Sequence, residues 1–597
     1  MYLEQISSPF DLKKLDITAL PILCEEIRRF LLEGMSKYGG HVAPNLGVVE
    51  LTVALHYIFV SPVDKIVFDV SHQAYVHKIL TGRKNLYDIF RNRGAKSTYQ
   101  RQYESEHDFF DLGLTSTSIS LASGLAKGRD VLGGDETIIA VIGDGSLSGG
   151  QAYEALNNAS VQFNNKKSRF IVVVNDNEYS IAPGVGALHN HLRALRESNG
   201  KLNNNIFTAL GYHYIYLENG NNVADCIGAV KQSILVDSPV VLHIHTIKGL
   251  GCDYAKADPY KWHYVFTPFD IESGEAQSGA NAADVNYAQI GAKNIDYMMK
   301  EHKDIVAIMA GNQILGKNFA EQHSSKYIDV GIAEANAVSY ASGIAKYGAR
   351  PFVFIEAAFI QRAYSQILID LALNANPAVI VLQGSGIILQ DSTHYGIFDI
   401  AALSHIPNLV CISPVCEDEY KMALDWAYEQ KFPTVIRLSR GGGNNPLANR
   451  QRSAIAPIEL NKYEIVKQGK EVAVIGLGIF FSIACDVVDM LAKRNINATL
   501  INPRFYSELD ESALKDIARD HALIVTIESG IREFGWGATV AAYYAQHPAP
   551  KHIEVLCFGA NKEFADWVPF DELLNRFGLT ATNISERIFN IINKRKE

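Results

Sequence analysis

The expected fold of this chain is decided by residues 137–159, TIIAVIGDGSLSGGQAYEALNNA. The first part consists almost entirely of Val, Ile and Ala, which is typical of a strand that a parallel sheet buries on both faces. Gly143 ends this run, Asp144 comes directly after Gly143, and a helical pattern begins at Gly149 and Gly150. The stretch therefore predicts a strand, a glycine turn and a helix in close succession.

Similar apolar runs recur along the chain, and each is followed by a turn residue and then by a helical pattern. They are FIVVVNDN (170–177), VVLHIHTIKG (240–249), IVAIMAGN (305–312), AVIVLQGSG (378–386), VAVIGLG (472–478) and ALIVTIESG (522–530). Alternation of buried strands with helices predicts repeated α/β units. We therefore expect an α/β fold in which helices flank mostly parallel sheets.

Two polar stretches without an apolar period divide the chain, at residues 267–286 and from residue 440 to residue 456. These two stretches predict that the chain is divided into three domains. The domains are expected at 1–270, 287–440 and 457–597, with linkers at 271–286 and 441–456.

The composition excludes several classes of protein. With 48% hydrophobic and 20% charged residues the chain is not disordered. Its net charge of −10, without a basic block, argues against binding to nucleic acid or to an anionic membrane. The seven cysteines form no CxxC pair, so we expect no zinc site, no disulfide framework and a reducing compartment. No signal peptide is expected, and the most apolar run, residues 472–484, is too short to span a bilayer. We expect a cytoplasmic enzyme.

Oxygen ligands follow two of the predicted strands. Asp144 comes directly after one strand, and Asn177 comes after the next. Ligands bind at the carboxyl ends of parallel strands, and such oxygens suit Mg²⁺ that is shared with phosphate. Gly145 allows the backbone to approach a diphosphate, and the following helix N-terminus favours the anion. A GDG turn alone is usually structural, but the paired Asn makes a magnesium–diphosphate site the better interpretation.

The GDG–Asn pair resembles the thiamin diphosphate motif of transketolase-like enzymes. The wider chain is similar, from end to end, to the 1-deoxy-D-xylulose 5-phosphate synthase family. The segments that carry the similarity are LEQISSPFDLKKL (3–15), HVAPNLGVVELTVALHY (41–57), DVSHQAYVHKILTGR (69–83), TSTSIS (115–120), VGALHNHL (185–192), GIAEANAV (331–338), FIQRAYSQ (359–366), DSTHYGIFD (391–399) and IRLSRG (436–441). The resemblance implies a three-domain transketolase-like architecture, thiamin diphosphate, Mg²⁺ and a homodimer.

The resemblance also assigns cofactor contacts. Asp144, Asn177 and the carbonyl of Tyr179 would hold Mg²⁺, while Gly145 and Ser146 would touch the diphosphate. A second set of positions departs from the family's GHSSTS and KGxGY patterns but would still lie at the cofactor. These positions are Gly113, Leu114 and Thr115, where Leu114 replaces a His, and Cys252, which replaces a Tyr.

Glu334 falls on the family position that hydrogen-bonds N1′ of the aminopyrimidine ring. A carboxylate there promotes the tautomer whose 4′-nitrogen takes the proton from the thiazolium C2. Phe359 would stack on the same ring. Without the resemblance, Glu334 would be an ordinary first-turn charge of a helix and Phe359 an ordinary core aromatic.

Four histidines lie inside matching motifs. By resemblance, His72 would lie near the diphosphate, while His41, His263 and His394 would surround the reacting carbon. Asp391, three residues before His394, would orient it. An imidazole is a suitable proton donor when an aldehyde oxygen becomes a hydroxyl. For each histidine taken singly, a purely structural role remains open.

The expected acceptor site departs from the family. Family members bind the acceptor phosphate with a Tyr and two Arg, and this chain has Glu356, Gly384 and Arg440 at those positions. The default reaction joins pyruvate and glyceraldehyde 3-phosphate, with loss of CO₂, into 1-deoxy-D-xylulose 5-phosphate, a step of isoprenoid and thiamin biosynthesis in the family. The alternatives are a synthase-like or transketolase-like enzyme with another donor or acceptor, and a catalytically silent paralogue.

Overall fold

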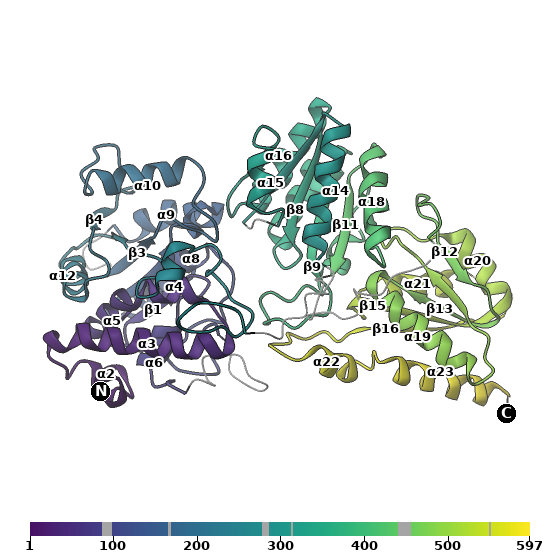
Figure 1. Ribbon diagram of the computed structural model, residues 1–597, viewed down its shortest axis with the longest axis horizontal. Helices are drawn as coiled ribbons and strands as arrows, with labels where there is room; N and C mark the ends of the chain where they lie inside the picture. Colours follow the sequence, from purple (N-terminus) through teal and green to yellow (C-terminus); the bar gives the residue numbers. More distant parts are fainter. Residues whose placement is uncertain are drawn as a thin grey trace. The chain divides into compact units, whose positions relative to one another are not determined.

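The computed structural model describes residues 1–85, 98–164, 169–277, 286–311, 314–439, 455–547 and 551–596. They form two compact units (Figure 1). The first contains Met1–Ala280 and Gly331–Ala333, and the second contains Asn281–Val330 and Glu334–Glu597. The expected linkers fall partly on residues 278–285 and 441–454, which lie outside the described residues.

The first unit is built on a five-stranded sheet in which every pair of neighbouring strands is parallel. The strand order is β1 (Lys65–Phe68), β2 (Ile138–Gly143), β3 (Phe170–Asp176), β5 (Val240–His245) and β4 (His213–Leu217). The helices are α1 (Tyr2–Gln5), α2 (Pro9–Leu12), η1 (Ile17–Ala19), α3 (Leu20–Tyr38), α4 (Val42–Leu46), α5 (Val49–Ile58), α6 (Tyr75–Leu80), α8 (Ser118–Leu132), η2 (Ser146–Ser148), α9 (Gly150–Gln162), α10 (Ala187–Glu197), α11 (Ile206–Ala209), α12 (Val223–Ile234) and α13 (Asp253–Ala257).

Both faces of this sheet are buried, as its run of apolar residues predicts. Ile138, Ala140 and Ile142 of β2 pack into one apolar cluster, and the alternate residues Ile139 and Val141 pack into another on the opposite face. Side chains on a strand alternate between faces, so a strand that is apolar at every position requires cover on both sides. The arrangement leaves the carboxyl ends of the strands, with their polar residues, at one edge.

The second unit contains two sheets. In the first, all neighbouring strands are parallel, in the order β10 (Val410–Ile412), β11 (Thr434–Ser439), β9 (Val379–Ser385), β8 (Arg350–Glu356), β6 (Ile305–Met309) and β7 (Tyr327–Asp329). Its helices are α14 (Tyr287–Glu301), α15 (Lys317–Gln322), α16 (Glu334–Tyr347), η3 (Ile360–Ala363), the π-helix η4 (Gln366–Ala372), α17 (Asp399–Leu403) and α18 (Glu417–Glu429).

The C-terminal sheet is parallel except at one edge, where β12 pairs antiparallel with β14. Its order is β12 (Glu464–Lys467), β14 (Thr499–Asn502), β13 (Glu471–Gly476), β15 (His521–Ile531) and β16 (Glu554–Ala560). The helices are η7 (Gly478–Phe480), α19 (Phe481–Ala492), α20 (Glu511–Asp520), α21 (Trp536–Gln546), α22 (Phe570–Arg576) and α23 (Ala581–Lys596).

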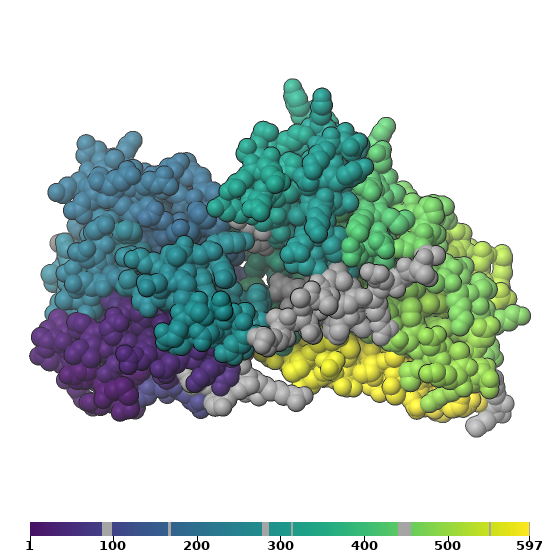
Figure 2. All heavy atoms as spheres, viewed as in Figure 1, coloured from purple at the N-terminus to yellow at the C-terminus, as the bar shows by residue number. Residues whose placement is uncertain are grey.

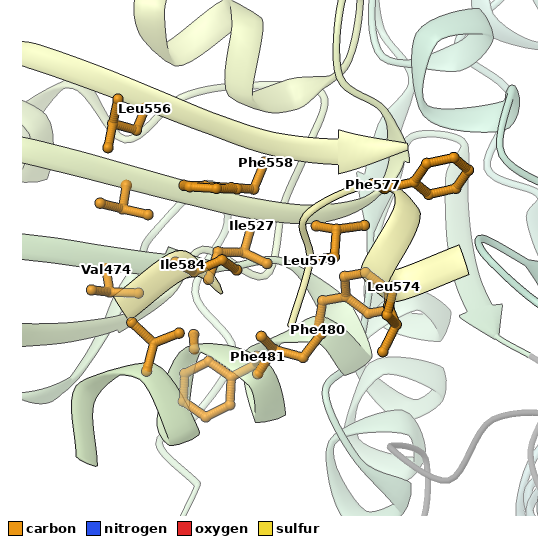
Figure 3. Close-up of a cluster of buried hydrophobic side chains, with 14 of the residues drawn as sticks. Val474, Phe480, Phe481, Ile527, Leu556, Phe558, Leu574, Phe577, Leu579 and Ile584 are labelled. Carbon is orange, nitrogen blue, oxygen red and sulfur yellow. The ribbon is translucent and has the colours of Figure 1, made fainter. Parts of the chain in front are cut away.

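The core of this C-terminal part joins three strands to its last helices. Val474, Ile527 and Phe558 of β13, β15 and β16 pack with Phe480 and with Ile584 of α23 (Figure 3). In Figure 2 the residues of α22 and α23, coloured yellow, form an outer layer of the second unit. The predicted α/β class with mostly parallel sheets is confirmed. No helix in the described ranges combines the length and the apolar character needed to cross a membrane.

Candidate active site

The predicted metal ligands lie at the carboxyl edge of the first sheet. Strands β2 and β3 are parallel neighbours, with Gly143 opposite Asn175, so the residues that follow them emerge together. Asp144 is buried, and its backbone N–H donates to the carbonyl of Asn175 across 3.1 Å. Asn177 is also buried, and its side-chain oxygen accepts from the Tyr179 N–H across 3.2 Å, which turns the chain after β3.

Asp144 has the features of a cation ligand. Its Oδ1 accepts a hydrogen bond of 3.0 Å from the neighbouring Gly145 N–H, while its buried Oδ2 has no hydrogen-bond partner among the described residues. Burial, together with the negative charge of Asp176, raises the pKa of Asp144 well above its ordinary range. A buried oxygen without a partner is costly, and a divalent cation would supply that partner. Asp144, Asn177 and the backbone carbonyl of Tyr179 could therefore hold Mg²⁺.

The neighbouring carboxylate, Asp176, already pairs with two basic side chains. It lies 2.5 Å from a guanidinium nitrogen of Arg196 and 2.9 Å from Nε2 of His243. Burial raises the pKa of Asp176, but hydrogen bonds from His243 and Arg196 outweigh burial and hold this pKa well below its ordinary range. Asp176 therefore carries a compensated charge, and of the two carboxyls Asp144 is the one available to a ligand.

Glycines keep the backbone close at the turn after β2. A Cβ added to Gly145 would lie 2.8 Å from the Cα of Ser180, and one added to Gly149 would lie 2.2 Å from Oγ of Ser116. Ser146 is buried, and its carbonyl accepts from the Ser116 hydroxyl across 2.7 Å. The turn ahead of α9 thus has the tight backbone packing that a diphosphate cradle requires.

The predicted cofactor positions Gly113, Leu114 and Thr115 lie directly ahead of α8. Gly113 is buried, whereas Leu114 and Thr115 are partly exposed. The next turn is fixed by Asp69, whose carboxylate accepts from the N–H groups of three successive residues at 2.8, 2.9 and 2.9 Å. Those residues are Ser116, Thr117 and Ser118. A buried carboxylate therefore holds the start of α8 and with it the segment of the three predicted residues.

Three of the four predicted histidines meet in the first unit. The ring centroids are 5.3 Å apart for His41 and His72, 5.8 Å for His41 and His263, and 5.6 Å for His72 and His263. Nδ1 of His41 lies 3.2 Å from the Tyr75 hydroxyl. Burial, helped by the positive charge of Lys248, lowers the pKa of His263 well below its ordinary range. His263 is therefore neutral, with one ring nitrogen that donates a hydrogen bond and one that accepts.

Sequence reasoning missed Lys248, which joins the histidines to the metal edge. It follows β5 and is buried, and its ammonium donates to the Ser180 carbonyl across 2.6 Å and to Nδ1 of His263 across 3.1 Å. Burial lowers the pKa of Lys248 to about 7, although attraction to Asp144 opposes the shift. The sequence could have indicated Lys248, because this lysine comes just after a buried strand, at the edge of the sheet where ligands bind.

Cys252 lies in an apolar environment. It is buried at the start of α13, its N–H donates to the Gly249 carbonyl across 3.2 Å, and it belongs to the apolar cluster that contains Ala255, Trp262 and Phe269. Burial raises the pKa of its thiol. Cys252 therefore contributes packing to the loop that carries Lys248.

In the second unit, Glu334 is the first residue of α16 and is 3% exposed. One of its carboxylate oxygens lies 3.6 Å from a guanidinium nitrogen of Arg362, which belongs to η3. Burial raises the pKa of Glu334, and Arg362 opposes that shift. The structure therefore pairs Arg362 with Glu334, a contact that the sequence did not predict.

Phe359, Asp391 and His394 also come together in the second unit. The rings of Phe359 and His394 meet edge to face, with centroids 5.3 Å apart. Nδ1 of His394 lies 3.0 Å from a carboxylate oxygen of Asp391 and 2.9 Å from the Thr393 hydroxyl. A carboxylate at Nδ1 fixes the ring and assigns the Nδ1 proton, which leaves Nε2 for other chemistry.

The two unusual acceptor positions lie on neighbouring strands. Glu356 ends β8 opposite Gln383 of β9, and Gly384 is the next residue of β9. Gly384 has a φ of +69°, and its carbonyl would lie 2.3 Å from a Cβ added to Gly396. The backbone at Gly384 therefore favours glycine over the family's Arg. Arg440 lies outside the described residues.

Comparison with known proteins identifies the family of the chain. Three family models match the chain: 1-deoxy-D-xylulose-5-phosphate synthase over residues 3–203, the pyrimidine-binding domain of transketolase over residues 283–444, and the transketolase C-terminal domain over residues 461–584.

Curated relatives match almost the whole chain. A 1-deoxy-D-xylulose-5-phosphate synthase of Symbiobacterium thermophilum is 36% identical over 98% of this chain and 94% of its own length. One from Geobacter sulfurreducens is 37% identical over 98% of this chain and 96% of its own, and one from a Geobacillus strain is 35% identical over the full length of both. The chain therefore belongs to the 1-deoxy-D-xylulose-5-phosphate synthase family, which consists of thiamin diphosphate-dependent transferases of the transketolase type.

Proposed function

We propose that this chain condenses pyruvate with an aldehyde, glyceraldehyde 3-phosphate by family membership, to give 1-deoxy-D-xylulose 5-phosphate and CO₂. The observation that carries the proposal is the buried Oδ2 of Asp144, near Asn177 at the same sheet edge, which has no hydrogen-bond partner in the part of the chain that the structure describes. This arrangement suits a cation that neutralises a diphosphate at the carboxyl edge of a parallel sheet. Bound thiamin diphosphate would supply the electron sink that decarboxylation of a 2-oxo acid requires.

Residues of the first unit would bind the cofactor's charged end. Asp144, Asn177 and the Tyr179 carbonyl would hold Mg²⁺, and the backbone at Gly145 and Ser146 would lie against the diphosphate. Among the described residues no three His, Cys, Asp or Glu side chains form a metal cluster, so the remaining Mg²⁺ ligands would come from phosphate and water.

Glu334 would hold a proton at N1′ of the pyrimidine ring. Its burial raises its pKa, and a carboxyl with a raised pKa shares a proton with a ring nitrogen more evenly than an exposed one does. Arg362, 3.6 Å away, keeps the carboxylate form accessible in this dry environment. Phe359 would stack on the pyrimidine.

The histidines would move protons at the substrate. His263 is neutral, and Lys248 donates to its Nδ1, so Nε2 would carry the ring proton and donate a hydrogen bond to a developing alkoxide. His41 lies beside it, with His72 toward the diphosphate end. By family membership, His394, oriented by Asp391, would be a second proton donor or acceptor.

A second candidate function keeps the same chemistry with another acceptor. Glu356 adds a negative charge and Gly384 removes a cation where family members hold the acceptor phosphate. Such a site would favour an uncharged aldehyde. A catalytically silent role is disfavoured, because Asp144, Asn177 and Glu334 are all retained in buried, chemically suited positions.

Homodimer formation is supported by two helices with related sequences. SLASGLAK (120–127) of α8 matches SYASGIAK (339–346) of α16 at six of eight positions. Among the described residues, a Cβ added to Gly124 or Gly343 on these helices would meet no atom within 4 Å. Tyr340 and Tyr347, which also belong to α16, are exposed. We propose that the exposed faces of α8 and α16 pack against a second copy of the chain in a homodimer in the cytoplasm. Sedimentation of the protein can test whether the dimer forms.

The proposed reaction is tested by incubating the protein with thiamin diphosphate, Mg²⁺, pyruvate and a panel of phosphorylated and unphosphorylated aldehydes. Products are identified by NMR and mass spectrometry. The proposal expects CO₂ and a 1-deoxyketose from at least one aldehyde, and no product from Glu334→Gln. Absence of any carbon–carbon bond formation by the wild-type protein would disprove it.

A further inference from the structure

His394 and Asp391 lie on a closed loop between β9 and α17. The loop begins at Gly386, whose N–H donates to the Gly396 carbonyl across 2.6 Å, and these two residues form an antiparallel bridge. Between them the chain has no helix or strand. The shape of the loop therefore depends on the groups that pack against its backbone.

Two of those groups come from the C-terminal part of the second unit, in the segment that follows β16. Oδ1 of Asp566 accepts a hydrogen bond of 3.2 Å from the Ser392 N–H. The next residue, Trp567, donates its own N–H to the Gln390 carbonyl across 2.9 Å. The loop is thus hydrogen-bonded on both sides of Asp391 by two consecutive residues that lie far away in the sequence.

Further contacts join the C-terminal part to the residues that directly follow the loop. The rings of Phe398, which follows the loop, and Phe564 have centroids 5.7 Å apart. The Ile531 N–H, at the end of β15, donates to the Ile397 carbonyl across 3.3 Å. Residues at and after the ends of two strands of the C-terminal sheet therefore contact the loop and the residues that follow it, and Asp566 contributes a carboxylate side chain to these contacts.

The Ser392 amide lies between the two residues that orient His394. Oδ1 of Asp391 accepts from the Thr393 N–H across 2.9 Å, and its other oxygen lies 3.0 Å from Nδ1 of His394. The Thr393 hydroxyl contacts both Asp391 and His394. A shift of the Ser392 peptide would move Asp391 and Thr393 together and would carry the imidazole with them.

We propose that Asp566 is a positioning residue for the active site. Its side-chain oxygen fixes the Ser392 amide through a hydrogen bond, and this bond fixes the Asp391–Thr393–His394 group in its working geometry. The C-terminal domain thereby contributes to the reaction without touching substrate or cofactor. The expected effect on the reaction rests on the function proposed above for His394. The expected effect on the structure of the loop does not.

The experiment compares the full-length wild-type protein with Asp566→Ala and Asp566→Asn. The side-chain oxygen of Asn still accepts from the Ser392 N–H, so Asp566→Asn is the conservative rescue. Asp571→Ala removes an exposed carboxylate from the first turn of α22 in the same domain and serves as the matched control. Hydrogen–deuterium exchange of the peptides covering residues 386–398 reports the loop directly.

We expect faster exchange of these peptides in Asp566→Ala, with exchange in the β13 and β15 peptides unchanged. We also expect kcat/KM for the condensation to fall about 10- to 100-fold, the scale expected for a misplaced reacting group. Asp566→Asn and Asp571→Ala should stay near the wild-type values in both measurements. A pH–rate profile that shifts only in Asp566→Ala would assign the effect to the Asp391–His394 pair.

Unchanged loop exchange in Asp566→Ala would overturn the proposal, and so would equal losses in Asp566→Ala and Asp571→Ala. If the wild-type protein shows no condensation at all, the proposed function fails, but the exchange comparison still decides whether Asp566 holds the loop. A variant that loses exchange protection throughout the C-terminal domain would show a folding defect and would also contradict a local positioning role.

Discussion

Nζ of Lys248 lies 3.1 Å from Nδ1 of His263, and the same ammonium donates to the carbonyl of Ser180. One buried cation therefore links the histidine cluster to the turn that follows Asn177. Burial lowers the pKa of Lys248 to about 7, so its charge is only weakly maintained in the free protein. A bound diphosphate would restore that charge.

Replacing Lys248 with alanine should weaken thiamin diphosphate binding. A charge-assisted hydrogen bond is worth about 1.5–3 kcal/mol, so we expect the dissociation constant to rise about 10- to 150-fold at saturating Mg²⁺. Isothermal titration calorimetry measures this directly. Lys256→Ala, on the exposed face of α13, is the control. An unchanged dissociation constant in Lys248→Ala would remove this lysine from the cofactor site.

Asp144→Ala should separate cofactor binding from stability. Without ligands, the variant should melt at or above the wild-type temperature, because it lacks a buried carboxyl oxygen that has no partner among the residues the structure describes. Thiamin diphosphate with Mg²⁺ should raise the melting temperature of the wild-type protein through linkage, and EDTA should reverse the rise. The variant should show no rise. If saturating thiamin diphosphate and Mg²⁺ leave the melting temperature of the wild-type protein unchanged, the metal assignment is refuted.

The sequence predicted the Asp144–Asn177 edge well, for a physical reason. Both residues follow strands buried on both faces, and consecutive strands of this kind become parallel neighbours whose carboxyl ends meet. The α/β class followed from the same pattern. The histidine motifs predicted a cluster only through the family resemblance, since His41 and His263 come from opposite ends of the first unit.

The contacts that the sequence did not predict join distant segments. Lys248 and Ser180 are 68 residues apart, and Ser392 and Asp566 are 174 residues apart. Such pairs depend on loop conformations, which strand and helix periodicity does not specify. The pairing of Glu334 with Arg362 was missed for the same reason, because it depends on how η3 packs against α16.

Glu528 should make stability depend on pH. This buried carboxyl accepts from the Gly537 N–H across 2.7 Å and from the Trp536 N–H across 3.2 Å at the start of α21. Burial raises the pKa of Glu528 from 4.5 to about 7, although these two hydrogen bonds act to lower it. The folded state therefore binds a proton more tightly than the unfolded state, and ionisation between these two pKa values lowers the free energy of unfolding as the pH rises.

Glu528→Gln removes this titration. The free energy of unfolding of the variant relative to wild type should therefore rise by up to about 3 kcal/mol from about pH 5 to about pH 8. Urea denaturation at several pH values measures the difference, with the exposed Glu533→Gln as control. A difference that stays constant over this range would contradict the raised pKa.

The acceptor preference should depart from that of a typical family member. Because Glu356 and Gly384 replace two family phosphate contacts, we expect kcat/KM for glyceraldehyde 3-phosphate to exceed that for unphosphorylated glyceraldehyde only slightly, or to fall below it. Glu356→Tyr should shift the ratio toward the phosphorylated aldehyde. Arginine at position 384 is a poor test, because Gly384 has a φ of +69°.

The competing interpretation is that Arg440 and other basic residues still bind the phosphate. It predicts a strong preference for glyceraldehyde 3-phosphate that is lost in Arg440→Ala. That outcome would restore the ordinary acceptor site and would show that Glu356 lies clear of the phosphate.

The most direct test of the account is hydrogen–deuterium exchange at C2 of thiamin diphosphate bound to this chain, followed by ¹H NMR after rapid acid quench. If Glu334 acts on the pyrimidine ring, the wild-type protein should accelerate the exchange, and Glu334→Gln should slow it by orders of magnitude while much of the cofactor affinity is retained. Glu356→Gln, at the end of β8, should exchange at the wild-type rate. Wild-type exchange in Glu334→Gln, or no acceleration by the wild-type protein, would contradict the claim that this chain activates thiamin diphosphate.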